Sequence, residues 1–278
     1  LSRKFLIGVG LVALAVSVLG SLGGFVVFQR ELSIRQITFL EDYVRERSSN
    51  VDRRFSNLTA LHRAAGEELE RRMNHMSDAE ADRLADRYFP LRPDGTRRSR
   101  DVYFDGTADE GSYIYGVGAM IGKADRLPPE QKKALVAAFE LVANFGQAAQ
   151  KDYDNFYFFT PPETRLVIFG PDRPDRLMFY RHEAPADLDI SKEEMSSLTT
   201  PEQDPNRVTR CTNLQRLIQD DAGERLATAC LTPAYVNGRY VGAFGSSIEL
   251  TGFLANAVKS AMPGASTLVV TSKGELIA

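Results

Sequence analysis

The stretch LATACLTPAYVNGRYVGAFGSSIEL, residues 226–250, decides the fold. Its two halves, Leu226 to Tyr235 and Tyr240 to Leu250, are rich in the small, aromatic and β-branched residues of strands, and Val236-Asn237-Gly238-Arg239 separates them. Asn-Gly supplies the positive φ angles of a tight two-residue turn. We therefore expect an antiparallel hairpin that turns at Asn237-Gly238.

A second hairpin is expected upstream of the first. The β-rich runs Phe156 to Thr160 and Arg165 to Phe169 flank Pro161-Pro162-Glu163-Thr164, whose prolines favour a turn. Before them, Pro128-Pro129-Glu130 begins an amphipathic run that ends before Gly146 and predicts a helix. Helices beside antiparallel hairpins indicate an α+β fold.

Shorter elements complete the expected order. We expect three short strands, Asp101–Phe104, Ser112–Ile121 and Leu177–Tyr180. Two helices are expected at Ser191–Ser197 and Thr251–Ser260, and the first hairpin of another sheet is expected from Ser266 onward. The basic run Arg97-Arg98-Ser99-Arg100 is typical of a solvated loop.

The N-terminal part of the chain has the length and composition of a membrane span. The 24 residues from Phe5 to Phe28 hold no charged side chain, and at about 1.5 Å per residue they reach across a hydrocarbon core of about 30 Å. A cleaved signal peptide is the alternative, but its apolar region is normally shorter. Arg3 and Lys4 before the span favour a cytoplasmic N-terminus, with all later residues outside.

Residues 30–88 predict a long amphipathic helix. Apolar side chains such as Ile37, Leu40, Val44 and Val51 recur at three- and four-residue spacings among many charges. Such a stripe packs either on its own domain or on a second copy of the chain. A capped restart of the helix is expected where Ser77 precedes Asp78-Ala79-Glu80.

The hairpin also carries a family resemblance. Its pattern Pro-x-Tyr-x-x-Gly-x-x-x-Gly-x-x-Gly spans Pro233 to Gly245, and Ile248-Glu249-Leu250 follows. In this order of elements the chain resembles the extracytoplasmic double-Cache sensor domain of bacterial transmembrane receptors, in which a long helix carries two stacked PAS-like lobes.

That resemblance implies four regions and a chain that continues beyond Ala278. These are a transmembrane anchor, a stalk or dimerisation helix, a membrane-distal PAS-like lobe built on an antiparallel sheet flanked by helices, and the start of a second, membrane-proximal lobe: 1–29, 30–88, 89–260 and 261–278.

The resemblance also bears on the ligand. Amino-acid-binding members of the family place an Asp for the ammonium group at the position that Ser247 occupies in this chain. A buried ammonium without a counter-charge costs several kcal/mol, so we expect a ligand other than a free amino acid. An anion, a neutral metabolite or no small molecule at all stays open.

Candidate ligand-binding residues follow from their positions on the expected sheet and in the segment after it: Tyr157, Phe159, Arg165, Arg176, Phe179, Tyr180, Arg181, His182, Tyr235 and Ser247. Alternating aromatic residues such as Tyr157 and Phe159 are also typical of a core. The arginines offer planar forks for a carboxylate, or lie on the surface.

Few other chemistries fit the sequence. Cys211 and Cys230 are the two cysteines and, in an oxidising compartment, favour a disulfide. The histidines His62, His75 and His182 stand in no catalytic or metal-binding motif, so we expect no catalytic residue, metal or cofactor in this segment. A net charge of −3 argues against a nucleic-acid partner.

The resulting hypothesis is the periplasmic sensing region of an inner-membrane bacterial receptor. The resemblance implies a homodimer and a cytoplasmic output domain, first a histidine kinase of a two-component system, with a diguanylate cyclase or a chemoreceptor as alternatives. An anchored scaffold that binds a periplasmic protein, without a small-molecule ligand, is the alternative from another class.

Overall fold

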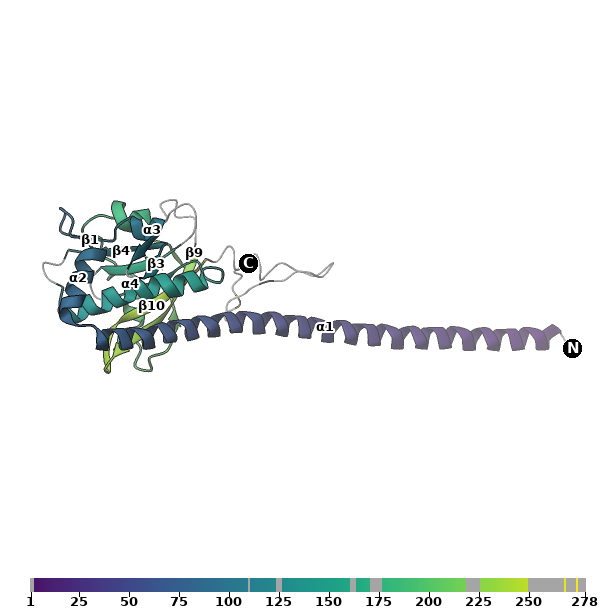
Figure 1. Cartoon of the computed structure of the whole chain (residues 1–278). Coiled ribbons are helices and arrows are strands. Elements are labelled where there is room, and N and C mark those ends of the chain that lie inside the picture. The colour runs from purple at the N-terminus through teal and green to yellow at the C-terminus, as the bar shows by residue number, and fades with distance from the viewer. Residues whose placement is uncertain are drawn as a thin grey trace. The chain divides into compact units, whose positions relative to one another are not determined.

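The structure, a computed structural model, describes residues 3–109, 111–123, 127–160, 164–170, 177–218 and 226–249, together with residues 268 and 274. Internal contacts divide the chain into two units, Leu1–Arg54 and Phe55–Ala278. The second unit contains the antiparallel sheet and its covering helices, which confirms the α+β class (Figure 1).

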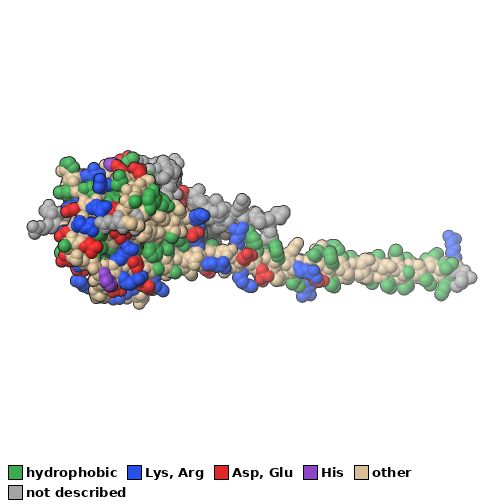
Figure 2. Space-filling model, in the orientation of Figure 1, with side chains coloured by type: hydrophobic (Ala, Val, Ile, Leu, Met, Phe, Trp, Pro, Cys, Tyr) green, Lys and Arg blue, Asp and Glu red, His purple; other side chains and the backbone are tan. Residues whose placement is uncertain are grey.

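Helix α1 runs without a break from Arg3 to His75. Its first part carries the apolar residues Phe5 to Phe28, whose large side chains are exposed, and Figure 2 shows no charged side chain among them. Among the described residues, α1 is the one helix long and apolar enough to cross a membrane.

The last part of α1 belongs to the second unit and buries one face. The residues on that face follow each other at helical spacings: Leu58, His62, Ala65, Leu69 and Met73. After a break, α2 (Asp78–Tyr88) begins with the Ser77 hydroxyl accepting a hydrogen bond from the Glu80 amide. The predicted capped restart at Ser77 is therefore confirmed.

The main sheet is antiparallel, and its strands follow the order β1-β4-β6-β5-β10-β9-β7, with β8 also paired to β9. The strands have these bounds: β1 Arg97–Arg98, β4 Val117–Ile121, β5 Phe156–Phe159, β6 Arg165–Phe169, β7 Arg210–Cys211, β8 Gln215–Arg216, β9 Leu226–Val236 and β10 Arg239–Glu249. A separate pair joins β2 (Thr107–Asp109) to β3 (Ser112–Ile114). Both predicted hairpins, β5–β6 and β9–β10, are confirmed.

The turn of the β9–β10 hairpin has the expected backbone, since φ is 50° at Asn237 and 77° at Gly238. Past the turn, the register shifts between Tyr240 and Gly242, and Gly242 has a φ of 150°. A Cβ on Gly242 would lie 2.4 Å from the Phe159 carbonyl oxygen. Only glycine therefore lets β10 approach the aromatic strand β5 at this point.

The sheet is buried on both faces, and successive residues of each strand alternate between them. Helices α2, α4 (Pro129–Ala149) and the end of α1 cover one face, on which lie Phe156, Phe158, Val167 and Phe244. The other face carries Tyr157, Phe159, Ile168 and Ala243 under residues of the long connection between β6 and β9. That connection contains η1 (Phe179–Glu183) and α5 (Glu194–Leu198).

Two predicted strands are wrong. Residues 101–104 lie in and beside helix α3 (Val102–Asp105), where the amide of Asp105 donates to the carbonyl of Asp101 at 2.9 Å and Gly106 ends the turn with a φ of 114°. Residues 177–180 lead into the π-helical turn η1 instead. These runs are too short for propensity to outweigh tertiary contacts.

The contacts that hold η1 come from the basic run that was expected to be a solvated loop. Arg98 is buried, and its guanidinium donates to the carbonyl oxygens of Tyr180 at 3.2 Å and Ala184 at 2.6 Å. The solvated interpretation of Arg98 is therefore wrong, because its charge satisfies the backbone of a distant turn. The expected elements after residue 250, including the second lobe at 261–278, lie outside the described residues.

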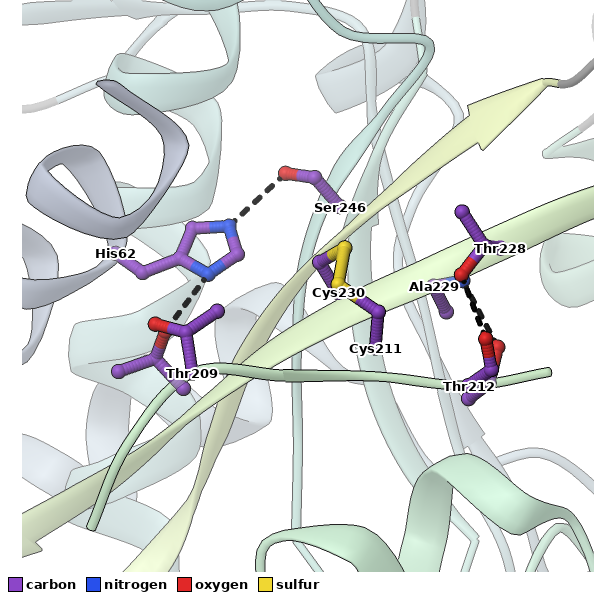
Figure 3. The surroundings of a disulfide bond; sticks show 9 residues. His62, Thr209, Cys211, Thr212, Thr228, Ala229, Cys230 and Ser246 are labelled. Carbon is purple, nitrogen blue, oxygen red and sulfur yellow. Dashed lines mark hydrogen bonds between the residues drawn. A yellow bond between two sulfur atoms is a disulfide. The ribbon is translucent and has the colours of Figure 1, made fainter. Parts of the chain in front are cut away.

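A disulfide joins Cys211 to Cys230 and ties β7 to β9, in which the two residues are opposite each other (Figure 3). Cys230 is fully buried, whereas Cys211 is exposed. The expected pairing of the two cysteines is thus present in the structure.

We expect Cys211→Ser to lower the free energy of unfolding by about 3 kcal/mol, because the bond closes a loop with a sequence separation of 19. Serine at the exposed position adds no buried polar group, so the loss measures the cross-link. Urea denaturation of the full chain, with the reduced wild type as the matched control, checks this value. Equal midpoints for the variant and the oxidised wild type would contradict it.

Candidate functional site

A cavity of about 40 Å³ lies on the sheet face opposite α4. Its sheet side is formed by Asn155, Tyr157, Leu166, Ile168, Ala229 and Ser247, and its cover by Tyr180, Ile190 and Met195; residues 215–218, which include strand β8, complete the lining. This volume exceeds the roughly 10–15 Å³ that one water needs. The cavity, between the central strands and the β6–β9 connection, is therefore large enough for water or for the end of a small molecule.

Tyr157 provides an unused polar group at the cavity. Its side chain is 3% exposed, and its hydroxyl has no hydrogen-bond partner among the described residues. Burial, with Tyr180 nearby, raises the pKa of Tyr157 well above its ordinary value, while the nearby Ser247 side chain, which does not meet the geometry of a hydrogen bond to the Tyr157 hydroxyl, acts in the opposite direction. The phenol stays neutral at physiological pH and offers one donor and an acceptor to an occupant.

Ser247 and Asn155 close the other end of the cavity. The Ser247 amide donates to Asn155 Oδ1 at 2.8 Å, and the Glu249 amide donates to an Asp154 carboxylate oxygen at 2.6 Å. These bonds hold the end of β10 against the residues that precede β5. The Ser247 hydroxyl is thereby positioned beside Tyr157.

The lining contains no carboxylate among the described residues, and its one charged residue, Arg216, is exposed. An ammonium group placed here would lose its hydration without gaining a counter-charge from the described lining, at a cost of several kcal/mol. The cavity is therefore suited to an uncharged, hydrogen-bonding group.

Three of the ten predicted ligand-binding residues line the cavity: Tyr157, Tyr180 and Ser247. Phe159 and Phe179 pack in the same apolar cluster without lining it. Arg176 lies outside the described residues.

Arg181 and His182 instead hold η1 to α3. Arg181 is buried, donates through Nε to Asp101 at 2.8 Å, and stacks on the Phe104 ring at 4.2 Å. His182 Nε2 lies 2.7 Å from the same carboxylate oxygen. Partial burial alone raises the pKa of Asp101, but these two hydrogen bonds bring that pKa below its ordinary value.

Arg165 and Tyr235 also lie away from the cavity. Arg165 is buried and donates to Gln131 of α4, so it is on the helix-covered side. The Tyr235 ring packs against the guanidinium of Arg207 at 3.9 Å and the ring of Tyr240 at 5.7 Å.

Sequence reasoning missed Asn155, Ile190, Met195 and residues 215–218. A signal existed for Asn155, since it stands two residues before Tyr157 and a strand places such pairs on one face. The others come from the long connection, where no periodicity indicates which residues fold back over the sheet.

A larger cleft of about 380 Å³ lies among α1, α2, α4 and the β2–β3 pair. Several of its charged groups are already paired, since Glu140 accepts hydrogen bonds from both Arg72 and Tyr88, and Arg87 pairs with Asp109. The described residues hold no cluster of three His, Cys, Asp or Glu suited to a metal. The smaller cavity, with its unpartnered phenol, is the better candidate site.

No protein-family model and no curated protein matches the chain. Among solved structures, the chain is similar to the ligand-binding domain of the Pseudomonas fluorescens chemoreceptor CtaA in complex with L-serine, with 18% identity over 51% of this chain and 53% of that one and a TM-score of 0.36. It is also similar to the ligand-binding domain of the Campylobacter jejuni chemoreceptor Tlp3 in complex with L-valine, with 15% identity over 55% and 56% and a TM-score of 0.38.

A further similarity is to the extracellular domain of vpHK1S-Z8, named as a histidine kinase, with 16% identity over 45% of this chain and 44% of that one and a TM-score of 0.33. The chain thus spans about half the length of the solved domains that it matches. These three solved domains are ligand-binding domains of two chemoreceptors and the extracellular domain of a protein named as a histidine kinase.

The position of the Tyr157 ring depends on Gly245, its partner across the strands. A Cβ on Gly245 would lie 2.4 Å from Cζ of that ring. We expect Gly245→Ala to displace the ring and to cost about 1–3 kcal/mol of unfolding free energy, as overpacking does. Gly66→Ala, in α1 where an added Cβ meets nothing within 4 Å, is the control and should stabilise slightly. Equal effects of the two substitutions, in thermal unfolding, would argue against this packing.

Proposed function

We propose that the chain is the extracytoplasmic sensing region of a membrane-bound receptor, and that the cavity beside Tyr157 is its ligand site. The observation that carries this proposal is the buried, unpartnered Tyr157 hydroxyl in a cavity between the central strands and their cover. Buried polar groups are nearly always satisfied. An unpartnered one that lines a cavity supports an occupant as its missing partner.

The ligand proposed is a small, uncharged molecule with hydrogen-bonding groups. Tyr157, Ser247 and Asn155 offer neutral donors and acceptors, and the described lining has no carboxylate for an ammonium group. Free amino acids and amines are therefore poor candidates.

The location proposed is the periplasmic side of a bacterial inner membrane. Support comes from Arg3 and Lys4 before the apolar span, which favour a cytoplasmic N-terminus. The Cys211–Cys230 disulfide supports it independently, because such bonds persist in oxidising compartments. The output domain proposed is a histidine kinase of a two-component system, with a chemoreceptor or a cyclic-dinucleotide enzyme as alternatives.

A homodimer through α1 is part of the proposal. Ile37, Leu40 and Val44 follow the heptad-like spacing of a pairing stripe and are exposed in the unit Leu1–Arg54. Parallel pairing with a second copy would cover them.

We expect the small-molecule ligand to raise the melting temperature of the full chain in lipid nanodiscs. A ligand at 100 times its dissociation constant stabilises by about 2.7 kcal/mol. Tyr157→Phe should weaken that ligand about five- to tenfold by removing one hydrogen bond, whereas Tyr113→Phe, at an exposed tyrosine, should change nothing. A panel of neutral metabolites, carboxylates and amino acids provides the ligands. Binding of amino acids alone would contradict the ligand class, and no shift with any compound would favour the protein-binding scaffold.

We expect Leu40→Cys to form a covalent dimer in membranes upon mild oxidation. The described part of the chain has no free cysteine to compete. Asp42→Cys is the matched control, because two residues along a helix is a turn of about 200° to the opposite face. Equal cross-linking at both positions, measured by non-reducing electrophoresis, would argue against a defined dimer stripe.

A further inference from the structure

Two adjacent serines of β10 face opposite sides of the sheet. Ser247 lines the cavity, whereas Ser246 is fully buried on the other side, where its hydroxyl lies 3.1 Å from Nε2 of His62 in α1. Alternation along a strand makes this arrangement obligatory. The cavity and helix α1 therefore contact neighbouring residues of one strand.

His62 is also bonded to the next strand. Its Nδ1 lies 3.1 Å from the Thr232 hydroxyl of β9, which in turn lies 2.8 Å from the Thr209 hydroxyl just before β7. The imidazole is 1% exposed, and burial lowers its pKa from the ordinary value to about 3. A neutral ring has one donor and one acceptor nitrogen, so these two hydroxyls use its full bonding capacity.

Strand β9 repeats the same relation to both faces. Ala229 lines the cavity, while its neighbour Cys230 lies on the α1 side and is bonded to Cys211. Strand β9 therefore carries both a cavity residue, Ala229, and, three residues later on the α1 side, the Thr232 that is bonded to His62.

The rest of the buried face of α1 is apolar: Leu58, Ala65, Leu69 and Met73. Apolar contacts are non-directional and permit a helix to shift by small steps. The two hydrogen bonds of His62 are directional and define one position of the helix against β9 and β10.

We infer that His62 is the positioning residue through which the cavity acts on helix α1: a change at Ser247 or Ala229 alters the Ser246 and Thr232 hydrogen bonds and so the position of α1. This inference rests on the proposed sensing function and states how occupancy of that site would change the position of α1. Helix α1 continues without a break to the apolar span, so a shift at His62 is transmitted along one helix. A ligand drives such a shift only by favouring one position over the other.

The test uses a filled cavity in place of an unidentified ligand. Ser247→Leu, and separately Ala229→Val, fill the cavity from neighbouring strands of the full chain in nanodiscs. The measurement is hydrogen exchange of the backbone amides of residues 58–66, resolved by mass spectrometry. We expect a change of about fivefold in those exchange rates, as for the gain or loss of one hydrogen bond. Ala134→Leu, which fills a separate cavity between α4 and β10, should leave them unchanged.

The same fillings are repeated in the His62→Leu and His62→Gln backgrounds. Leucine removes both hydrogen bonds and should abolish the response, whereas glutamine keeps a donor and an acceptor and should restore part of it. A purely structural role would lower stability in both backgrounds without removing the response. If His62→Leu fails to fold, Ser246→Ala and Thr232→Val remove the bonds one at a time, and each should reduce the response.

An undiminished response to cavity filling in His62→Leu, or in both hydroxyl variants, would overturn the inference. No response in the wild-type background would also overturn it. The proposed function fails separately, when no small molecule stabilises the chain, and that outcome leaves a response to cavity filling in place as evidence for coupling.

Discussion

The close packing of β10 against the aromatic strand β5 is the constraint on which the rest of the molecule depends. Gly242 and Gly245 lie where a Cβ would meet the Phe159 carbonyl and the Tyr157 ring at 2.4 Å. Their absent side chains let the last described strand enter the middle of the sheet, between β5 and β9. The same contact holds the Tyr157 ring over β10. It also fixes which residues of β10 face each side of the sheet, so that Ser247 faces the cavity and Ser246 faces His62. A local glycine spacing thus determines both the site and its link to α1.

The polar groups, rather than the volume, distinguish the candidate site from the larger cleft. In the cleft, Glu140 is already bonded to Arg72 and Tyr88, so a ligand would have to replace existing interactions. In the cavity, the Tyr157 hydroxyl has lost its hydration and has gained no described partner. The free-energy cost of removing that hydroxyl from water is therefore already present in the folded chain, and a ligand that bonds to the hydroxyl offsets it. The small volume, and a described lining without a carboxylate, then favour an uncharged group as the occupant.

Sequence reasoning succeeded where the determining interactions are local. The Asn237-Gly238 turn, the Ser77 cap and the proline start of α4 each depend on a few adjacent residues, and each is present. It failed at residues 101–104 and 177–180, because distant partners decide their conformation: Arg98 satisfies the carbonyls of η1, and Asp101 binds Arg181. For the site, the alternation of side chains along paired strands places Tyr157 and Ser247 on the same face of the sheet. The alternation of side chains along a strand does not predict that residues 190 and 195 fold over them, or that residues 215–218 complete the lining.

A strand is the shortest physical link between a cavity on one face of a sheet and a helix on the other. Adjacent Cα atoms are about 3.8 Å apart, so a backbone change at one residue moves its neighbour directly. The neighbour transmits that movement only if its contact across the interface depends on direction. Ser246 meets this condition because its hydroxyl is bonded to His62, whereas nearby Phe244 and Ile248 make apolar contacts that adapt to small shifts. A buried, neutral histidine in an otherwise apolar helix face is costly for packing alone, and positioning α1 against two strands is a function that accounts for its presence.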